Sequence, residues 1–230
     1  MGYRIRVYRH HGSVFFAIFG LLLTAIVIFL LVGATEVAFQ RLGFSRLQVV
    51  LILVGTFVGA SVNIPLWRSK SLKKVLETEE VQFFWITYRI PHIEVKEVST
   101  LIAVNLGGAL IPLVVSLYLL GTHLQIVPYA LPGVLLTAIV VHLVVRRVPG
   151  LGIATPAFIP PIAAALAAYI IAPSASNIIA YVSGTLGTLI GADLTNLRGI
   201  GELGAPVASI GGAGTFDGVF LSGIMAVILV

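Results

Sequence analysis

Residues 14–32 of the chain read VFFAIFGLLLTAIVIFLLV, a run that contains no charged side chain. An apolar run of about 18 residues or more is typical of a helix that crosses a bilayer. The run is also longer than the roughly 7–15 apolar residues of a secretory signal. We therefore predict a retained membrane helix here.

Six further stretches share this character. Of the 230 residues, 58% are apolar and only 10% are charged, and the mean hydropathy is +1.08. A soluble domain carries about 25% charged residues, so the composition excludes that class. We predict an all-α integral membrane protein with about seven transmembrane helices in a single domain, residues 1–230. The further spans are expected at 49–66, 98–120, 126–145, 151–172, 177–197 and 204–230.

The basic residues predict how the chain is oriented. With a cytoplasmic N-terminus, twelve of the fourteen Lys and Arg residues lie inside, and only Arg41 and Arg46 lie outside. We interpret the formal net charge of +5 mostly as this topology signal. We therefore expect a multi-pass protein of the cell membrane whose partner is the lipid bilayer. Nucleic-acid binding is disfavoured because no soluble basic face exists to carry it.

The one sizeable loop, residues 68–97, is expected on the cytoplasmic side. Its charged start favours a short amphipathic helix. Residues 81–90 and 93–98 favour two short strands joined by a turn at Pro91-His92. Such a small hairpin serves either as a structural cap or as an edge that receives an extended peptide by strand addition.

An internal repeat is predicted from two similar segments. Residues 55–63 read GTFVGASVN and residues 187–196 read GTLIGADLTN. Each is followed by a span with Gly-Gly-Ala, at residues 107–109 and 211–213. Repeat one would cover residues 14–120 and repeat two residues 151–230, with a connecting helix at 126–145. Both copies would run in the same direction.

The two aspartates of the chain, Asp193 and Asp217, both lie in apolar segments. An acid at membrane depth costs about 2.5–3.5 kcal/mol, so such residues face protein or water and are functional candidates. Asp193 is about 24 Å and Asp217 about 20 Å from the outer ends of their helices. This match places both acids in the cytoplasmic third of the bilayer.

Glycines surround the second aspartate. Gly211, Gly212 and Gly214 are denser than helix packing needs, and they indicate an unwound stretch beside Asp217. Such a stretch is allowed at membrane depth only within protein or beside a wet cavity. A close pair of carboxyls shares one proton, which suits activation of water for peptide hydrolysis. The same pair of carboxyls could equally transport a proton or a cation across the membrane.

The segment 212–222, GAGTFDGVFLS, resembles the Gly-x-Gly-Asp motif of presenilin-type intramembrane aspartyl proteases. Ala192-Asp193-Leu194 is similar to the Tyr-Asp motif of that family, and Pro156-Ala157-Phe158 to its Pro-Ala-Leu motif. The likeness departs at Thr215 and Phe216, which separate Gly214 from Asp217. The whole chain also resembles an uncharacterised family of small polytopic membrane proteins from archaea and bacteria. The protease resemblance implies Asp193 and Asp217 as catalytic acids, with Pro156–Phe158 beside the cleft.

Three functions stay open at this point. The first is an intramembrane aspartyl protease that acts on a transmembrane peptide, and the second is a proton- or cation-coupled transporter that uses the same acids. The third is a structural membrane protein. Asn63, as a helix cap or ligand, and Asn196, as a bond between helices, complete the candidate site. No cofactor is expected, and scattered histidines with no cysteine argue against a metal site.

Overall fold

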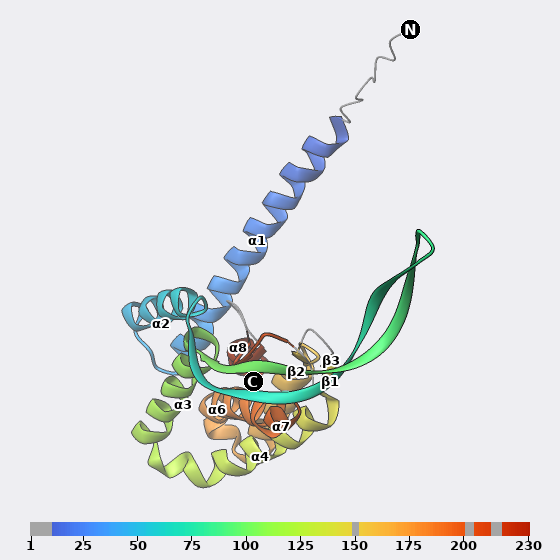
Figure 1. Ribbon diagram of the computed structural model, residues 1–230. Helices are drawn as coiled ribbons and strands as arrows, with labels where there is room; N and C mark the ends of the chain where they lie inside the picture. The colour runs from blue at the N-terminus through green and yellow to red at the C-terminus, as the bar shows by residue number, and fades with distance from the viewer. Residues whose placement is uncertain (1–10, 149–151, 201–204, 213–217) are drawn as a thin grey trace.

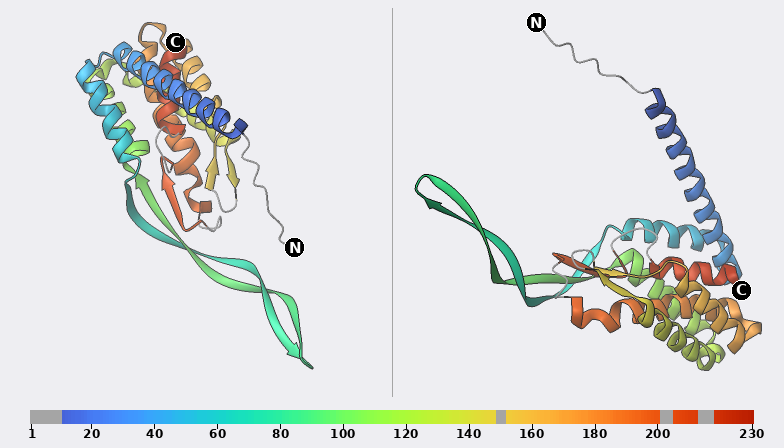
Figure 2. Two further views of the ribbon diagram at one scale, coloured as in Figure 1. Left: turned by 90° about the horizontal axis from the view of Figure 1, so that it is seen from above. Right: turned by 90° about the vertical axis from the view of Figure 1, so that its right-hand side faces the viewer.

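The computed structural model describes residues 11–148, 152–200, 205–212 and 218–230. They form a bundle of helices and a long two-stranded ribbon that projects from one end of the bundle (Figure 1). The first helix leaves the bundle at an angle, so that its first turns lie away from the other helices (Figure 2). The fold is therefore mainly helical, and its β-sheet is larger than the small hairpin that the prediction included.

Seven helices of 12 residues or more account for the helical region as described. They are α1 (His11–Arg41), α2 (Arg46–Gly59), α3 (Ile111–Thr122), α4 (Val127–Val144), α5 (Ile159–Ile171), α6 (Ser176–Thr188) and α8 (Gly218–Leu229). Two π-helices, η1 (Leu106–Leu110) and η4 (Leu189–Asp193), adjoin α3 and α6. Shorter helical turns are η2 (Leu124–Ile126), η3 (Pro173–Ala175), η5 (Leu194–Asn196) and α7 (Leu197–Ile200).

Three helical stretches in the described chain are long and apolar enough to cross a membrane. They are Phe15–Arg41, Leu124–Val144 and Pro173–Asn196, which overlap the first, fourth and sixth predicted spans. They indicate a membrane protein. The other four predicted spans each contain a shorter helix and a stretch of strand. A short run of apolar β-branched residues fits a buried strand as well as a helix, so the sequence pattern alone did not separate the two.

Helix α6 lies at the centre of the bundle. In the most apolar window of Pro173–Asn196, 72% of residues are buried, against none in the corresponding window of α1. Glycines let neighbouring helices approach: a Cβ on Gly187 would lie 2.6 Å from Thr137 of α4, and one on Gly184 2.7 Å from the Ser222 carbonyl of α8. Glycines at these positions thus allow close helix packing, as small residues do in membrane proteins.

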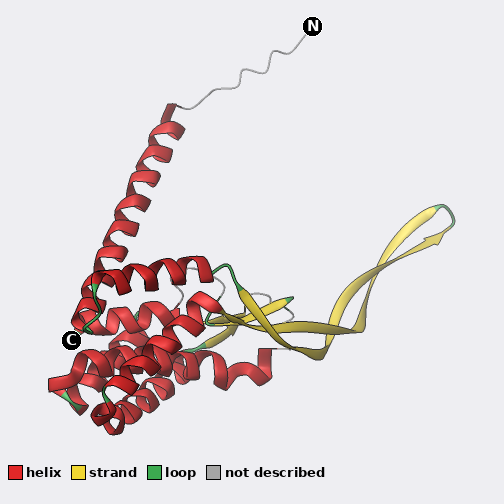
Figure 3. Cartoon of the chain, turned by 90° about the vertical axis from the view of Figure 1, so that its left-hand side faces the viewer, coloured by secondary structure: helices red, strands yellow, loops and turns green. Residues whose placement is uncertain are grey.

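The sheet caps the end of the bundle opposite the chain's C-terminus (Figure 3). Strands β1 (Asn63–Phe83) and β2 (Ile86–Asn105) are antiparallel, and β5 (Val207–Ile210) pairs with β2 in parallel. A separate small sheet joins β3 (Arg146–Val148) to β4 (Gly152–Ala154). The order β1-β2-β5 brings Val207–Ile210 of the second predicted repeat beside β2 of the first.

The ribbon corrects the prediction for residues 68–97. Its strands begin at Asn63 and end at Asn105, and the expected amphipathic helix is part of β1. The turn is at Phe84-Trp85, whereas Pro91 lies within β2, opposite Thr78. Proline is tolerated in a strand whose N–H side is not needed for pairing, so it did not mark the turn.

Candidate functional site

Asp193 joins the end of the central helix to the end of the short strand β5. It is the last residue of η4, the π-helix that continues α6, and it is half-buried. Its Oδ2 accepts the backbone N–H of Gly211, the residue after β5, at 2.8 Å. π-Helical turns inside longer helices occur frequently at functional sites. This hydrogen bond therefore joins two residues predicted for the site, the acid Asp193 and the glycine Gly211.

The Gly211-Gly212 pair is not helical, in agreement with the expected break. Gly211 has φ +81° and Gly212 φ +72°, a region that favours glycine. A Cβ on Gly211 would also lie 2.6 Å from the amide nitrogen of Ala109 in η1. A Cβ on Gly108 would in turn meet the carbonyl of Gly211. The two Gly-Gly segments therefore touch, backbone to backbone.

A hydrogen-bond network surrounds the first of these segments. Asn105 is fully buried; its Nδ2 donates to the Ala60 carbonyl at 2.8 Å and to Asn63 Oδ1 at 3.1 Å. Its Oδ1 accepts the N–H of Gly108 at 2.7 Å, which caps η1. Asn63 Oδ1 also accepts from the Ser209 hydroxyl of β5 at 2.6 Å. Since α2 ends at Gly59, Asn63 starts β1 and links three strands instead of capping the helix.

Asn196 belongs to a different polar group. It is buried, its Oδ1 accepts from Arg147 Nε at 3.0 Å, and its Nδ2 donates to the Ala192 carbonyl at 2.9 Å. Nearby, His142 Nδ1 and the Thr195 hydroxyl lie 2.9 Å apart. This group ties α4 and β3 to the end of α6. Its hydrogen-bond partners differ from those of Asn63, so the two asparagines belong to separate networks.

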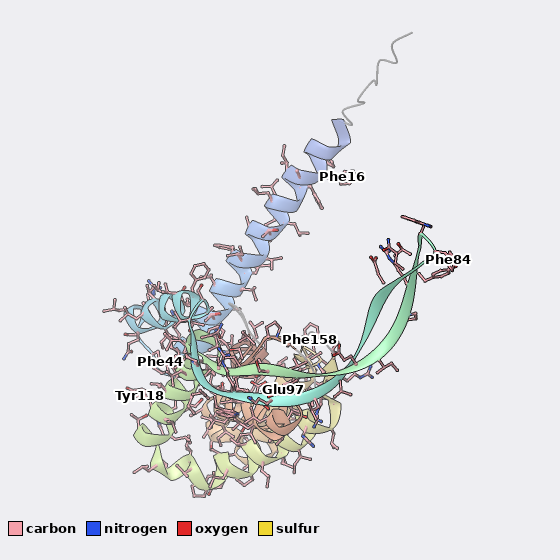
Figure 4. The ribbon with its side chains drawn as sticks, viewed as in Figure 1. Phe16, Phe44, Phe84, Glu97, Tyr118 and Phe158 are labelled. Carbon is pink, nitrogen blue, oxygen red and sulfur yellow. The ribbon has the colours of Figure 1, made fainter. Side chains whose placement is uncertain are left out.

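The remaining predicted site residues fall into two sets. Pro156, Ala157 and Phe158 are exposed just before α5, and Phe158 is 65% exposed. Figure 4 labels Phe158 among the side chains around the bundle. Gly214 and Asp217 lie outside the described residues. The separation of the two carboxyls therefore stays a prediction.

Two contributors to the site were missed from the sequence. Neither Ser209 nor Asn105 is among the residues that the sequence predicted for the site. Both stand two residues before a Gly-Gly pair, in Asn105-Leu106-Gly107-Gly108 and Ser209-Ile210-Gly211-Gly212. That shared pattern of polar residue, aliphatic residue and Gly-Gly was the available signal. Among the described residues, no group of three or more His, Cys, Asp or Glu could hold a metal ion.

The comparison with protein families covers most of the chain and includes the whole site. Residues 57–229 match the family described as "Protein of unknown function (DUF1614)". The chain belongs to the DUF1614 family. No curated protein and no solved structure matches it significantly. DUF1614 membership agrees with the expected uncharacterised family and adds no activity.

Proposed function

We propose that this DUF1614 protein is an intramembrane aspartyl protease in which Asp193 and Asp217 are the two acids. The observation that supports it best is the 2.8 Å hydrogen bond between Asp193 and the N–H of Gly211. Gly211 precedes Asp217 by only six residues, so the proposal requires only a short segment to bring the second acid to the first. In the proposed active site, the carboxyl groups of Asp193 and Asp217 lie together.

The chemistry follows from a carboxyl pair with one shared proton. The ionised member takes a proton from water, which attacks the peptide carbonyl, while the protonated member gives its proton to the carbonyl oxygen. Collapse of the tetrahedral intermediate then breaks the C–N bond, and the leaving nitrogen takes up a proton. No metal or cofactor is required for this sequence of steps.

Strand β5 supports the peptide-binding half of the proposal. It is the terminal strand in the sheet order, and within the described chain only β2 pairs with it. Its last residue, Ile210, directly precedes the glycine that Asp193 holds. An extended peptide that adds to an exposed sheet edge gains main-chain hydrogen bonds. A peptide added to the free edge of β5 would therefore run past Asp193.

The test uses purified protein in liposomes with a panel of single-span model peptides, and mass spectrometry detects the fragments. Asp193→Asn and Asp217→Asn should each abolish cleavage, because each removes one ionisable acid. Glu36→Gln is the matched control, since it removes a half-exposed carboxylate of α1 at the opposite end of the bundle. Cleavage that persists at more than a tenth of the wild-type rate in either Asp→Asn variant would refute the dyad.

A second candidate function, proton- or cation-coupled transport, is favoured by a different observation. The π-helices η1 and η4 both contact Gly211, η1 through Ala109 and η4 through Asp193, and the bonded side chains of Asn63 and Ser209 lie on β1 and β5. Transporters commonly bind ions at interrupted helices, through unwound backbone and polar side chains. Liposomes loaded with a pH-sensitive dye distinguish the two functions. Flux that is lost in Asp193→Asn, with no peptide cleavage, would select transport, and the absence of both would leave the structural role.

A further inference from the structure

A groove on the surface of the bundle, between α4 and α5, is lined only by apolar side chains. Its volume is about 430 Å³. Leu136 and Val140 form the side on α4, and residues of α5 from Ile159 to Ile170 form the other side. Ala163 and Ala167 lie within the groove, and their small side chains leave the space that the larger neighbours enclose. The groove can therefore hold an apolar chain.

The groove opens on the outer surface of the bundle and not toward the central helix α6. On α4, Thr137 faces α6, because a Cβ on Gly187 would lie 2.6 Å from it. The groove residues are on a different face: Leu136 is 50% exposed, and Leu166 of α5 is 56% exposed. Helix α4 belongs to Leu124–Val144, one of the stretches that are long and apolar enough to cross a membrane. The groove therefore opens on the surface that a bilayer would surround.

The length of the groove matches one leaflet of a bilayer. Its side on α5 runs from Ile159 to Ile170, which is about 16 Å at a rise of about 1.5 Å per residue. The hydrocarbon core of a bilayer is about 30 Å thick, so one leaflet is about 15 Å. An acyl chain of a single lipid has this reach. A partner helix that crossed the membrane would extend well beyond the groove.

One end of the groove adjoins two arginines. Helix α4 ends at Val144, and Arg146 and Arg147 follow it in β3. Strand β3 pairs with β4, where Ala154 is opposite Arg146, and α5 begins five residues later at Ile159. The small sheet therefore joins the end of α4 to the start of α5, and its arginines are at the same end of the groove as Ile159.

The two arginines have different surroundings. Arg147 Nε donates to Asn196 Oδ1 at the end of α6, at 3.0 Å. Successive side chains of a strand point to opposite faces, so Arg146 lies on the face of β3 away from Asn196, and it is exposed. Within the described parts of the chain, neither guanidinium forms an ion pair with a carboxylate. The end of the groove thus carries positive charge that an anion can neutralise.

We propose that this groove binds an anionic phospholipid, with one acyl chain between α4 and α5 and its phosphate at Arg146. A guanidinium binds phosphate oxygens through two parallel hydrogen bonds, and basic pockets between membrane helices bind anionic headgroups. Lipid tails are as apolar as the groove, so the charge of the headgroup selects the lipid. The orientation predicted from the basic residues places Arg146 at the cytoplasmic leaflet, which carries anionic lipids. The lipid site does not depend on the chemistry proposed for Asp193.

Native mass spectrometry of the full chain in detergent tests the headgroup contact. Dioleoyl phosphatidylglycerol should bind about tenfold more tightly than dioleoyl phosphatidylcholine, which has the same acyl chains and no net charge, because hydrogen bonds to a charged group contribute on this scale. Arg146→Gln should remove most of this preference. Arg46→Gln is the matched control, since Arg46 is also an exposed arginine but begins α2. Equal affinity of the wild type for the two lipids, or an equal loss in both variants, overturns the proposal.

A phosphatidylglycerol with a photoreactive diazirine in its acyl chain locates the site in the wild-type protein. After irradiation in nanodiscs, peptide mass spectrometry should find the label concentrated in α4 and α5. Ala163→Phe fills the groove and should remove most of this label, because a close-packed groove leaves no room for the chain. Ala25→Phe makes the same change on the exposed surface of α1 and should leave the label unchanged. Unchanged circular dichroism and gel-filtration profiles show that the variants fold.

Two outcomes of the labelling experiment refute the lipid site. A label spread evenly over all exposed helices would mean that lipids only surround the protein and that none is held in the groove. A wild-type dimer that Ala163→Phe converts to a monomer would mean that a second copy of the chain occupies the groove instead.

Discussion

The two Gly-Gly segments have nearly the same sequence and different conformations. Gly107 and Gly108 belong to the π-helix η1, whereas Gly211 and Gly212 form a left-handed turn after β5. The difference lies in the acceptor of the backbone N–H. Gly108 donates to Asn105 of its own segment, but Gly211 donates to Asp193, 18 residues earlier. The comparison shows that a distant acceptor and the neighbouring backbone select the conformation of a glycine pair.

The strongest test of this difference is Gly211→Ala. The new Cβ would occupy a left-handed backbone and clash with the Ala109 amide, so we expect a loss of about 3 kcal/mol or more. Thermal unfolding in detergent, followed by tryptophan fluorescence, measures the loss. Gly121→Ala in α3 is the control, since its Cβ meets open space. A helix gains about 0.5–1 kcal/mol from that change. Equal melting temperatures for the two variants would show that the segments do not touch.

The Asn105→Ala substitution tests the first Gly-Gly segment, Gly107-Gly108. The change removes the acceptor of the buried Gly108 N–H and the donor to Ala60, so we expect a loss of about 2–3 kcal/mol. Chemical denaturation in detergent measures it. Asn63→Ala is the comparison, because Asn63 is exposed and shares the same network. A larger cost for Asn63→Ala than for Asn105→Ala would contradict the assignment of Asn105 as the central residue.

Two substitutions of Asp193 test how the second Gly-Gly segment, Gly211-Gly212, is held in place. Asp193→Ala leaves the Gly211 N–H without its acceptor and should cost about 1–2 kcal/mol. Asp193→Asn keeps an acceptor oxygen at that position and should cost less than about 1 kcal/mol. Thermal unfolding of the two variants at one pH gives the comparison. If both lose the same stability, the hydrogen bond to Gly211 does not hold the turn.

Ser209→Ala should have the smallest effect. Its hydroxyl bonds to Asn63 at an exposed site that joins the two segments, and exposed substitutions stay within about 0.5 kcal/mol. Hydrogen exchange followed by mass spectrometry is the more sensitive measurement. We expect faster exchange confined to β5 and the start of β1. Faster exchange throughout the bundle would mean that this link stabilises the whole fold.

The sequence predicted the membrane class because apolar stretches of spanning length need only composition to be recognised. It also predicted that Gly211 and Gly212 interrupt the helix, since adjacent glycines disfavour helix locally. The strand segments were missed: residues 98–105 are apolar and β-branched beside a helix, and their partner Val207–Ile210 is about 100 residues away. The turn was misplaced because Pro91 is a strong local signal, whereas the turn at Phe84-Trp85 is set by strand register.

In the candidate site, too, some features could be predicted from residue type and others depend on tertiary contacts. The amino-acid sequence by itself determined that the chain is an apolar membrane protein with an acid at Asp193 and flexible glycines at 211 and 212, because these depend on residue type. The tertiary structure alone decided that Asp193 accepts from Gly211, that Asn63 bonds to Ser209, and that the two Gly-Gly segments touch. Those contacts join residues far apart along the chain. Parallel pairing of β2 with β5 creates them, and no local pattern encodes that pairing.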